Sequence, residues 1–154
     1  MRFRVLVLIA ALSTPIWGQA AARPHEPPAG ADAAAGQAAS LEDACISDLR
    51  LLGTAQGTYA GLHPDRGFAR KLSQLGPKGE NLVGPELPTG KKDGYRFTLT
   101  VKNAKSPVSH YEIHATPLVR LIPTQDSYYV DETGVIRWTA EDRRAGPTDP
   151  QIKQ

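Results

Sequence analysis

The chain has 154 residues, in which 18 lysines and arginines face 16 aspartates and glutamates. Arg2 and Arg4 lie in a segment that we expect to be removed, which leaves the mature chain without a basic excess. A chain with balanced charge has no long-range attraction for nucleic acid or anionic lipid, so neither is an expected partner. The remaining residues, about 130, suit one domain that can bury a core without disulfides or metals.

Residues 1–22 have the features of an export signal. Arg2 and Arg4 form a short basic region, residues 5–12 are an unbroken apolar run, and small residues create cleavage sites after Ala20 and Ala22. A helix needs about 20 apolar residues to cross a bilayer, so this run is too short for a permanent anchor. We therefore expect a periplasmic or secreted protein with no stable membrane insertion after signal cleavage.

Both ends of the mature chain are predicted to lack structure. Residues 23–39 are rich in proline, alanine and glycine and have no large apolar side chain, which is typical of a flexible tether. Residues 140–154 are predicted to be a disordered polar tail. The folded domain is therefore expected to cover residues 40–139.

The domain is expected to begin with a helix of about 20 residues. Ser40 is a suitable N-cap, and Gly61 and Pro64 are suitable stop signals. Positions at helical spacing form an apolar stripe that only one polar residue interrupts: Leu41, Cys45, Leu49, Leu52, Gln56 and Tyr59. Cys45 is the lone cysteine, so it cannot form an internal disulfide. We interpret it as a small buried residue, with an intermolecular disulfide as the alternative.

Residues 64–94 are predicted to be mostly irregular. A turn at residues 64–67 precedes one or two helical turns, and residues 78–94 are expected to form a loop that follows the surface. Apolar side chains are expected to hold this region on the core: Phe68, Leu72, Leu75, Leu82, Val83 and Leu87.

The last third of the chain changes from helical to strand periodicity. Alternating apolar residues predict four strands, at residues 95–101, 110–115, 127–130 and 135–139. Asp131 and Gly134 are suited to a four-residue hairpin turn between the last two. Consecutive strands with short loops form an antiparallel meander, whose apolar face needs the helix as a cover. The expected fold is α+β, with one long N-terminal helix packed on a four-stranded antiparallel sheet and disordered ends.

This order of motifs resembles the globular headgroup domain of type IV pilin-like proteins and pseudopilins. The resemblance covers roughly residues 41–138. It rests on Ala-Gln-x-x-Tyr-Ala at residues 55–60, Pro-Asp-Arg-Gly-Phe at 64–68, Gly-Tyr-x-Phe-x-Leu at 94–99, Tyr-x-Ile-x-Ala-x-Pro at 111–117 and Asp-Glu-x-Gly-Val-Ile-Arg at 131–137.

The chain departs from the pilin pattern at its N-terminus. Pilins have a Gly-Phe-type prepilin cleavage site, a glutamate shortly after it, and an apolar half-helix that holds subunits together in the fibre. Here a polar segment rich in proline and alanine occupies that place. The resemblance therefore implies a headgroup fold, an exported location and protein binding. It carries no catalytic residues, and assembly into a fibre by the usual route is not expected.

Two sets of residues invite a metal-binding interpretation. His110, Glu112 and His114 share one face of a predicted strand, but the two histidines are about 13 Å apart along it, too far to bind one zinc ion. Asp126, Asp131 and Glu132 flank the last hairpin, and calcium prefers oxygen ligands of this kind. Aspartate is also common in turns for backbone reasons, and we prefer that interpretation of Asp131.

The sequence contains no nucleophile motif and no phosphate-binding loop, so we assign no catalytic, cofactor-binding or metal residue and expect no cofactor. We predict an exported, non-enzymatic, pilin-like structural or protein-interaction module with a possible protein partner in the cell envelope. The alternative is an extracytoplasmic domain that binds a small ligand, a glycan or calcium.

Overall fold

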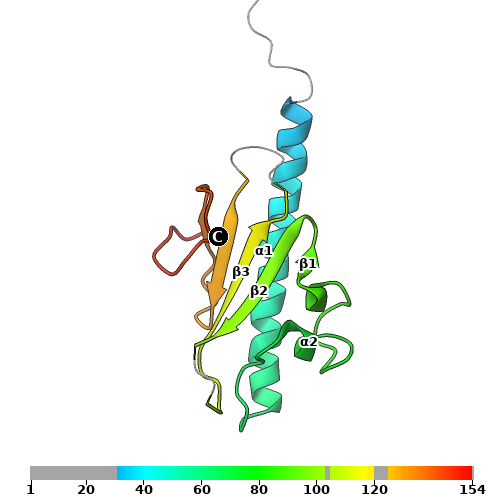
Figure 1. The fold of residues 1–154 in the computed structure, drawn as a ribbon, viewed down its shortest axis with the longest axis vertical. Helices are drawn as coiled ribbons and strands as arrows, with labels where there is room; N and C mark the ends of the chain where they lie inside the picture. Colours follow the sequence, from blue (N-terminus) through cyan, green and yellow to red (C-terminus); the bar gives the residue numbers. More distant parts are fainter. Residues whose placement is uncertain (1–30, 103–104, 120–124, 154) are drawn as a thin grey trace, which may run out of the picture.

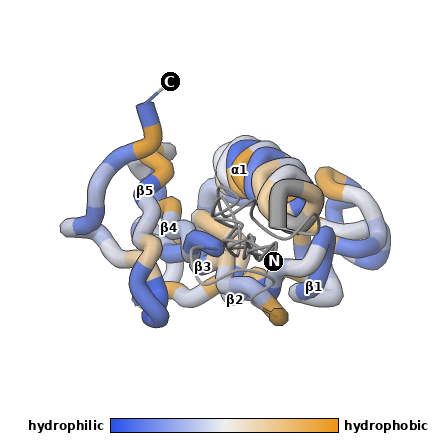
Figure 2. The backbone as a smooth tube through the Cα atoms, turned by 90° about the horizontal axis from the view of Figure 1, so that it is seen from above, coloured by the Kyte–Doolittle hydropathy of each residue, from blue (hydrophilic) through white to orange (hydrophobic). Residues whose placement is uncertain are grey.

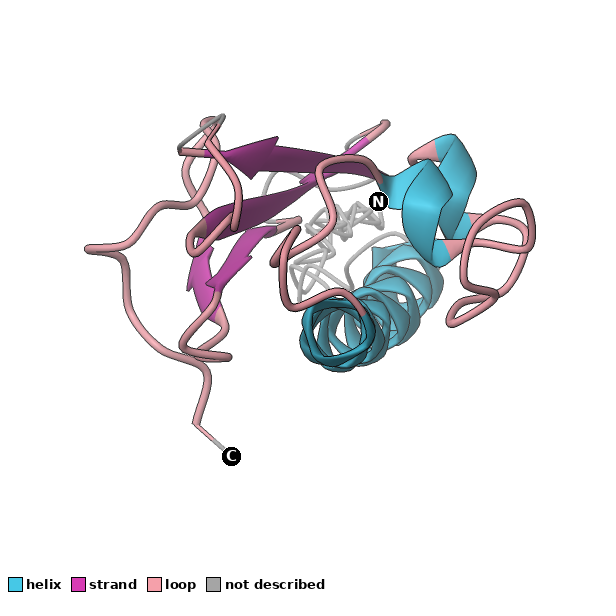
Figure 3. Cartoon of the chain, turned by 90° about the horizontal axis from the view of Figure 1, so that it is seen from below, coloured by secondary structure: helices cyan, strands magenta, loops and turns pink. Residues whose placement is uncertain are grey.

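A computed structural model describes residues 31–102, 105–119 and 125–153. These residues form an α+β fold with two layers, in which one long helix lies across one face of an antiparallel sheet (Figures 1 and 3). The α+β prediction is confirmed at this level. Among the described residues, no helix is both long enough and apolar enough to cross a membrane. The export signal and the first part of the predicted tether lie outside the described residues.

Helix α1 spans Ala31–Leu62, so it begins nine residues before the predicted N-cap, Ser40. The prediction of a flexible tether is therefore wrong for residues 31–39. Six of these nine residues are alanine, which has the highest helix propensity of all residues. The part of the helix that packs on the sheet is already formed, so the helix can extend into these alanines without a new nucleation step. The C-terminal end of the helix is close to the prediction, because Gly61 and Pro64 flank Leu62.

The predicted apolar stripe of α1 faces the core. Leu41 is partly buried, and the other members are at most 3% exposed: Cys45, Leu49, Leu52, Gln56 and Tyr59. The interpretation of Cys45 as a small buried core residue is confirmed. Gln56, which interrupts the stripe, is fully buried and bonds to the backbone of Ala69 at two points. Its Nε2 donates to the Ala69 oxygen at 3.1 Å, and its Oε1 accepts from the Ala69 nitrogen at 2.8 Å.

Residues 64–90 pack on the core through two short elements. These are α2 (Leu72–Leu75) and the 3-10 helix η1 (Leu87–Thr89). The predicted apolar anchors of this region are buried or half-buried: Phe68, Leu72, Leu75, Leu82, Val83 and Leu87. At Gly67 the backbone has φ of 72°, and an added Cβ would lie 2.2 Å from the oxygen of Val108. Only glycine fits at this position.

The sheet has five strands, in the order β1 (Lys91–Lys92), β2 (Tyr95–Val101), β3 (Tyr111–Pro117), β4 (Ser127–Asp131) and β5 (Arg137–Thr139). All neighbouring strands are antiparallel. The prediction of four strands is wrong, because the sheet has a fifth strand, β1, at its edge. Strand β1 lies in residues 78–94, which were predicted to be a loop. Asp93 and Gly94 have φ of 47° and 78° and join β1 to β2 as a two-residue hairpin turn. The ammonium of Lys92 then holds β1 on the helix, at 2.7 Å from the Asp48 carboxylate.

The inward faces of the strands are those that alternation predicted. On β2, Tyr95 and Phe97 are buried and Leu99 is half-buried; on β3, the buried residues are Tyr111, Ile113 and Ala115. The predicted turn between β4 and β5 is also present, because the Gly134 nitrogen donates to the Asp131 oxygen at 3.0 Å and Gly134 has φ of 74°. Strand β4 differs from the expected pattern, since its first four residues are all buried.

The C-terminal segment is folded. The prediction of a disordered tail is wrong for residues 140–153, which fold back on the sheet beside β5 (Figure 1). The Trp138 nitrogen donates to the Pro150 oxygen, and the Ile152 nitrogen donates to the Ile136 oxygen, both at 3.0 Å. Ala145 is only 1% exposed. Residues 150–152 thus cover the open edge of β5, which would otherwise present unpaired backbone groups.

Candidate functional site

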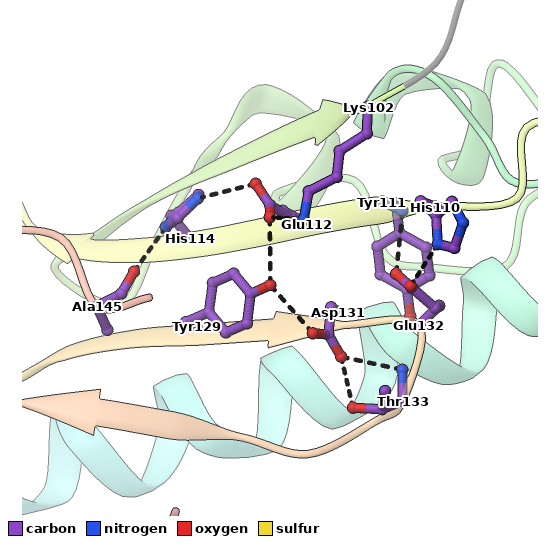
Figure 4. Close-up of polar contacts among 10 residues, drawn as sticks. All are labelled: Lys102, His110, Tyr111, Glu112, His114, Tyr129, Asp131, Glu132, Thr133 and Ala145. Atoms are coloured by element: carbon purple, nitrogen blue, oxygen red, sulfur yellow. Dashed lines mark hydrogen bonds and ion pairs between the residues drawn. The ribbon is translucent and has the colours of Figure 1, made fainter. Parts of the chain in front are cut away.

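A concentration of titratable side chains lies on the face of β3 and β4 that points away from α1 (Figure 4). Residues that alternate with the inward core residues occupy this face, and the strand register places His114 opposite Tyr129 and Glu112 opposite Asp131. Lys102 reaches the same face from the residue after β2. We call Lys102, Glu112, His114, Tyr129 and Asp131 the polar cluster.

Glu112 is the centre of the polar cluster. The ammonium of Lys102 lies 2.7 Å from its Oε1, and Nε2 of His114 lies 4.0 Å from its Oε2. The Tyr129 hydroxyl is 3.3 Å from Oε1 of Glu112 and 3.0 Å from Oδ2 of Asp131. A hydroxyl has one proton to donate, so Tyr129 bonds to one carboxylate at a time, and Asp131 is the nearer.

Asp131 is bound from both sides. Besides the Tyr129 hydroxyl, it accepts hydrogen bonds from the backbone nitrogen of Thr133 at 3.0 Å and from the Thr133 hydroxyl. Burial raises its pKa, but the hydrogen bonds from Thr133 and Tyr129 outweigh burial and hold the pKa below its usual value. The preferred interpretation of Asp131 as a turn residue is confirmed by this pattern, which is typical of an aspartate at the first position of a turn.

His114 links the polar cluster to the C-terminal segment. Its Nδ1 is 3.0 Å from the Ala145 oxygen, which can only accept, so Nδ1 carries the proton and Nε2 faces Glu112. Burial lowers the pKa of His114, whereas the hydrogen bond to Ala145 and the charge of Glu112 raise it. The net shift of the pKa is downward. Its ring also meets the Tyr129 ring edge-on, with centroids 5.3 Å apart.

The second predicted histidine takes part in a separate contact. Nδ1 of His110 lies 2.6 Å from Oε1 of Glu132, and Oε2 of Glu132 accepts from the Tyr111 nitrogen at 3.3 Å. Burial raises the pKa of Glu132, but the hydrogen bond and charge of His110 together with the backbone hydrogen bonds outweigh burial, so the pKa lies below its usual value. Thus Glu132 joins the β4–β5 turn to the start of β3, and the two histidines do not share a partner.

The structure does not bring the predicted calcium ligands together. Asp131 and Glu132 lie at the end of β4, whereas Asp126 precedes its first residue, about 17 Å away along the strand. The Asp126 nitrogen donates to Oε1 of Glu42, at 3.0 Å. Within the described residues, no group of three or more histidine, cysteine, aspartate or glutamate residues could hold a metal ion.

Two hollows on the surface lie apart from the polar cluster. One, of about 360 Å³, is lined mainly by proline and glycine residues between α2 and η1. The other, of about 670 Å³, lies between Arg50 of α1, the turn at residues 133–136 and the C-terminal residues 151–153. Neither hollow is lined by Glu112, His114 or Tyr129.

The sequence analysis named His110, Glu112, His114 and Asp131. It missed Lys102, Tyr129 and the hollow that Arg50 and Lys153 line, which we call the cationic hollow. Tyr129 was missed because the first four residues of β4 are all buried, and a strand that is buried on both faces shows no alternation. The pairing of Tyr129 with His114 depends on the strand register, which the loop lengths alone did not reveal.

Comparisons with protein-family models, with curated proteins and with solved structures found no match for this chain.

Proposed function

We propose that this chain is an exported, non-enzymatic, pilin-like domain that acts through protein–protein contacts in the cell envelope or outside the cell. The observation that carries the proposal is the path of α1, which covers the sheet with its apolar stripe and extends beyond the sheet at its N-terminal end, where residues 33, 35–37 and 39 are exposed and Ala38 is buried (Figure 1). A helix that is longer than its own sheet, followed by an antiparallel meander and a closing hairpin, is the arrangement that the resemblance to pilin headgroups implies.

The overhanging part of α1 differs from a pilin stalk in its side chains. Residues 33, 35, 36, 37 and 39 are exposed and small or polar, so they offer no large apolar surface to a fibre core or to lipid. This composition favours an individual headgroup on a soluble helical stem over an assembled fibre, because packing of the usual kind needs buried apolar area.

The contacts of the polar cluster favour a structural role over a catalytic one. Asp131 is occupied by Thr133 and Tyr129, Glu112 by Lys102, and the donor nitrogen of His114 by the Ala145 oxygen. A general acid or base must instead reach a substrate atom from within a cleft. We infer that the cluster locks β3, β4 and the C-terminal segment together. The alternative function, binding of a small ligand, glycan or calcium, has no comparable support at this cluster.

The export part of the proposal is tested by purifying the mature chain from the periplasm and the medium and determining its N-terminal sequence. We expect the mature chain to begin at Ala21 or Arg23, after cleavage at Ala20 or Ala22. An intact Met1 in a membrane fraction, or a chain confined to the cytoplasm, would contradict it.

The interaction part is tested in the same cells with a photo-cross-linking amino acid at Ala35, on the exposed overhang, and at Thr54, on the exposed side of α1 beside the sheet. A domain that works by protein contacts should give a discrete adduct with one envelope protein from at least one position. Uniform failure at both positions, with the exported chain present at normal abundance, would count against the proposal.

A further inference from the structure

The hollow between α1 and the C-terminal segment is lined by positive charge without a balancing acid. Arg50 stands on the exposed side of α1 and Lys153 near the end of the chain, and both line the hollow. Its other lining residues come from the turn at 133–136 and from Gln151 and Ile152, so the described residues of the lining include no acidic side chain. Within the described part of the chain, neither cation forms an ion pair or a side-chain hydrogen bond.

Three acidic residues close in sequence to the turn and to the C-terminal part of the lining already have partners. Asp131 is bound by Thr133 and Tyr129, and Glu132 by His110 and the Tyr111 nitrogen. Asp149 is held by the guanidinium of Arg143, at 2.6 and 2.7 Å. The two cations of the hollow are therefore available to an anion from outside.

Another hollow, distinct from the two described above, offers a comparison. It is lined by Arg66 and Lys78, but also by Glu80, whose carboxylate lies 2.7 Å from Nε2 of His63. That hollow contains its own negative charge. The hollow at Arg50 and Lys153 does not, so its charge selects more strongly for an anionic group.

Part of the lining of the hollow is aliphatic. Ile136 is buried, and Val135 and Ile152 are half-buried, while the amide of Gln151 and the hydroxyl of Thr133 add polar groups. Two cations and an amide in one lining with three aliphatic side chains match a carboxylate that is carried next to an apolar side chain. A sugar acid fits less well, because ring hydroxyls that lie against the aliphatic side chains would have no hydrogen-bond partner there.

We propose that this hollow binds an acidic, partly apolar segment of a protein partner, with Arg50 and Lys153 contacting its carboxylate. This inference rests on the proposed function, which it deepens by naming the contact surface and the chemistry of the partner. Arg50 can bind a carboxylate through two parallel N–H groups, whereas Lys153 contributes a single mobile charge.

The test measures binding of a fluorescently labelled peptide of alternating glutamate and leucine to the mature chain, by anisotropy at low salt. We expect saturable binding, a loss of affinity of about fivefold or more in Arg50→Gln and in Lys153→Gln, and weakening by added salt. The control is Lys91→Gln, which removes an exposed charge from β1, at the opposite edge of the sheet, and should change affinity less than about twofold. A peptide with glutamine in place of glutamate should not bind.

Equal weakening by Lys91→Gln would overturn the proposal, because it would show attraction by net charge alone. Binding that is unchanged in both Arg50→Gln and Lys153→Gln would overturn it too, as would tighter binding of polygalacturonate than of the peptide. The envelope adduct described above separates this inference from the proposed function. If Arg50→Gln retains that adduct in full, the hollow is not the contact surface, whereas the interaction function stands.

Discussion

Replacing Leu49 by alanine should lower the free energy of unfolding by about 3 kcal/mol, within the 2 to 5 kcal/mol observed for buried leucines. Leu49 lies in the middle of the apolar stripe of α1 and is fully buried against the sheet. Its truncation removes apolar contacts and leaves a cavity between two rigid layers, which can close only in part. Urea unfolding followed by circular dichroism measures the change.

Leu51→Ala is the matched control for this prediction. It makes the same chemical change two residues away on the same helix, but Leu51 is 43% exposed. We expect it to cost less than about 1 kcal/mol. Equal losses for the two variants would mean that α1 does not face the sheet as described.

Gln56→Met should destabilise the fold by about 2 to 4 kcal/mol, although methionine has a similar size and a higher hydrophobicity. The Gln56 amide satisfies both the nitrogen and the oxygen of Ala69, which is itself fully buried. Methionine leaves a backbone donor and a backbone acceptor without partners inside the core, and each costs about 1 to 3 kcal/mol. The midpoint of urea unfolding reports the loss.

Gln37→Met provides the comparison for Gln56→Met, because Gln37 is exposed on the overhanging part of α1. Its replacement should change stability by less than about 0.5 kcal/mol. If Gln56→Met were as stable as the native chain, the two-point bond to Ala69 would not exist in solution.

The parts of the fold that periodicity specifies could be predicted from the sequence. The core face of α1 and the inward residues of β2 and β3 follow from spacings of 3.6 and 2 residues, and the β4–β5 turn follows from Asp131 and Gly134. Strand β1 was missed because two residues are too few to show alternation. The Asp93–Gly94 pair next to it is a known hairpin signal and could have revealed it.

The C-terminal segment could not be predicted from its composition. Residues 140–153 are mostly polar, and their order depends on contacts with distant residues: Ala145 with His114, Pro150 with Trp138, and Ile152 with Ile136. Such contacts appear only when the sheet has formed. The polar cluster could not be predicted for the same reason, because its members come from three strand regions that only the folded sheet brings together (Figure 4). The cationic hollow could not be predicted either, because Arg50 and Lys153 are about 100 residues apart in the chain.

At the start of α1, the structure is more ordered than the sequence composition predicted. Residues 23–39 were treated as one tether because proline and glycine dominate their first part. The alanines after residue 30 have high helix propensity, and a helix that is already stabilised by its apolar stripe extends into them at little cost.

The central structural claim is that the apolar stripe of α1 lies against the inward face of the sheet. Figure 2 shows α1 beside the strands in a view from above. The lone cysteine provides the most direct test of this claim, because Cys45 is completely buried in that stripe and burial raises the pKa of its thiol well above the usual range. The measurement is the rate at which a thiol reagent labels the mature chain at neutral pH, with and without denaturing urea. The structure predicts that the folded chain stays unlabelled for as long as it remains folded, and that urea makes Cys45 react at once; labelling of the folded chain at the rate of the unfolded chain would contradict it.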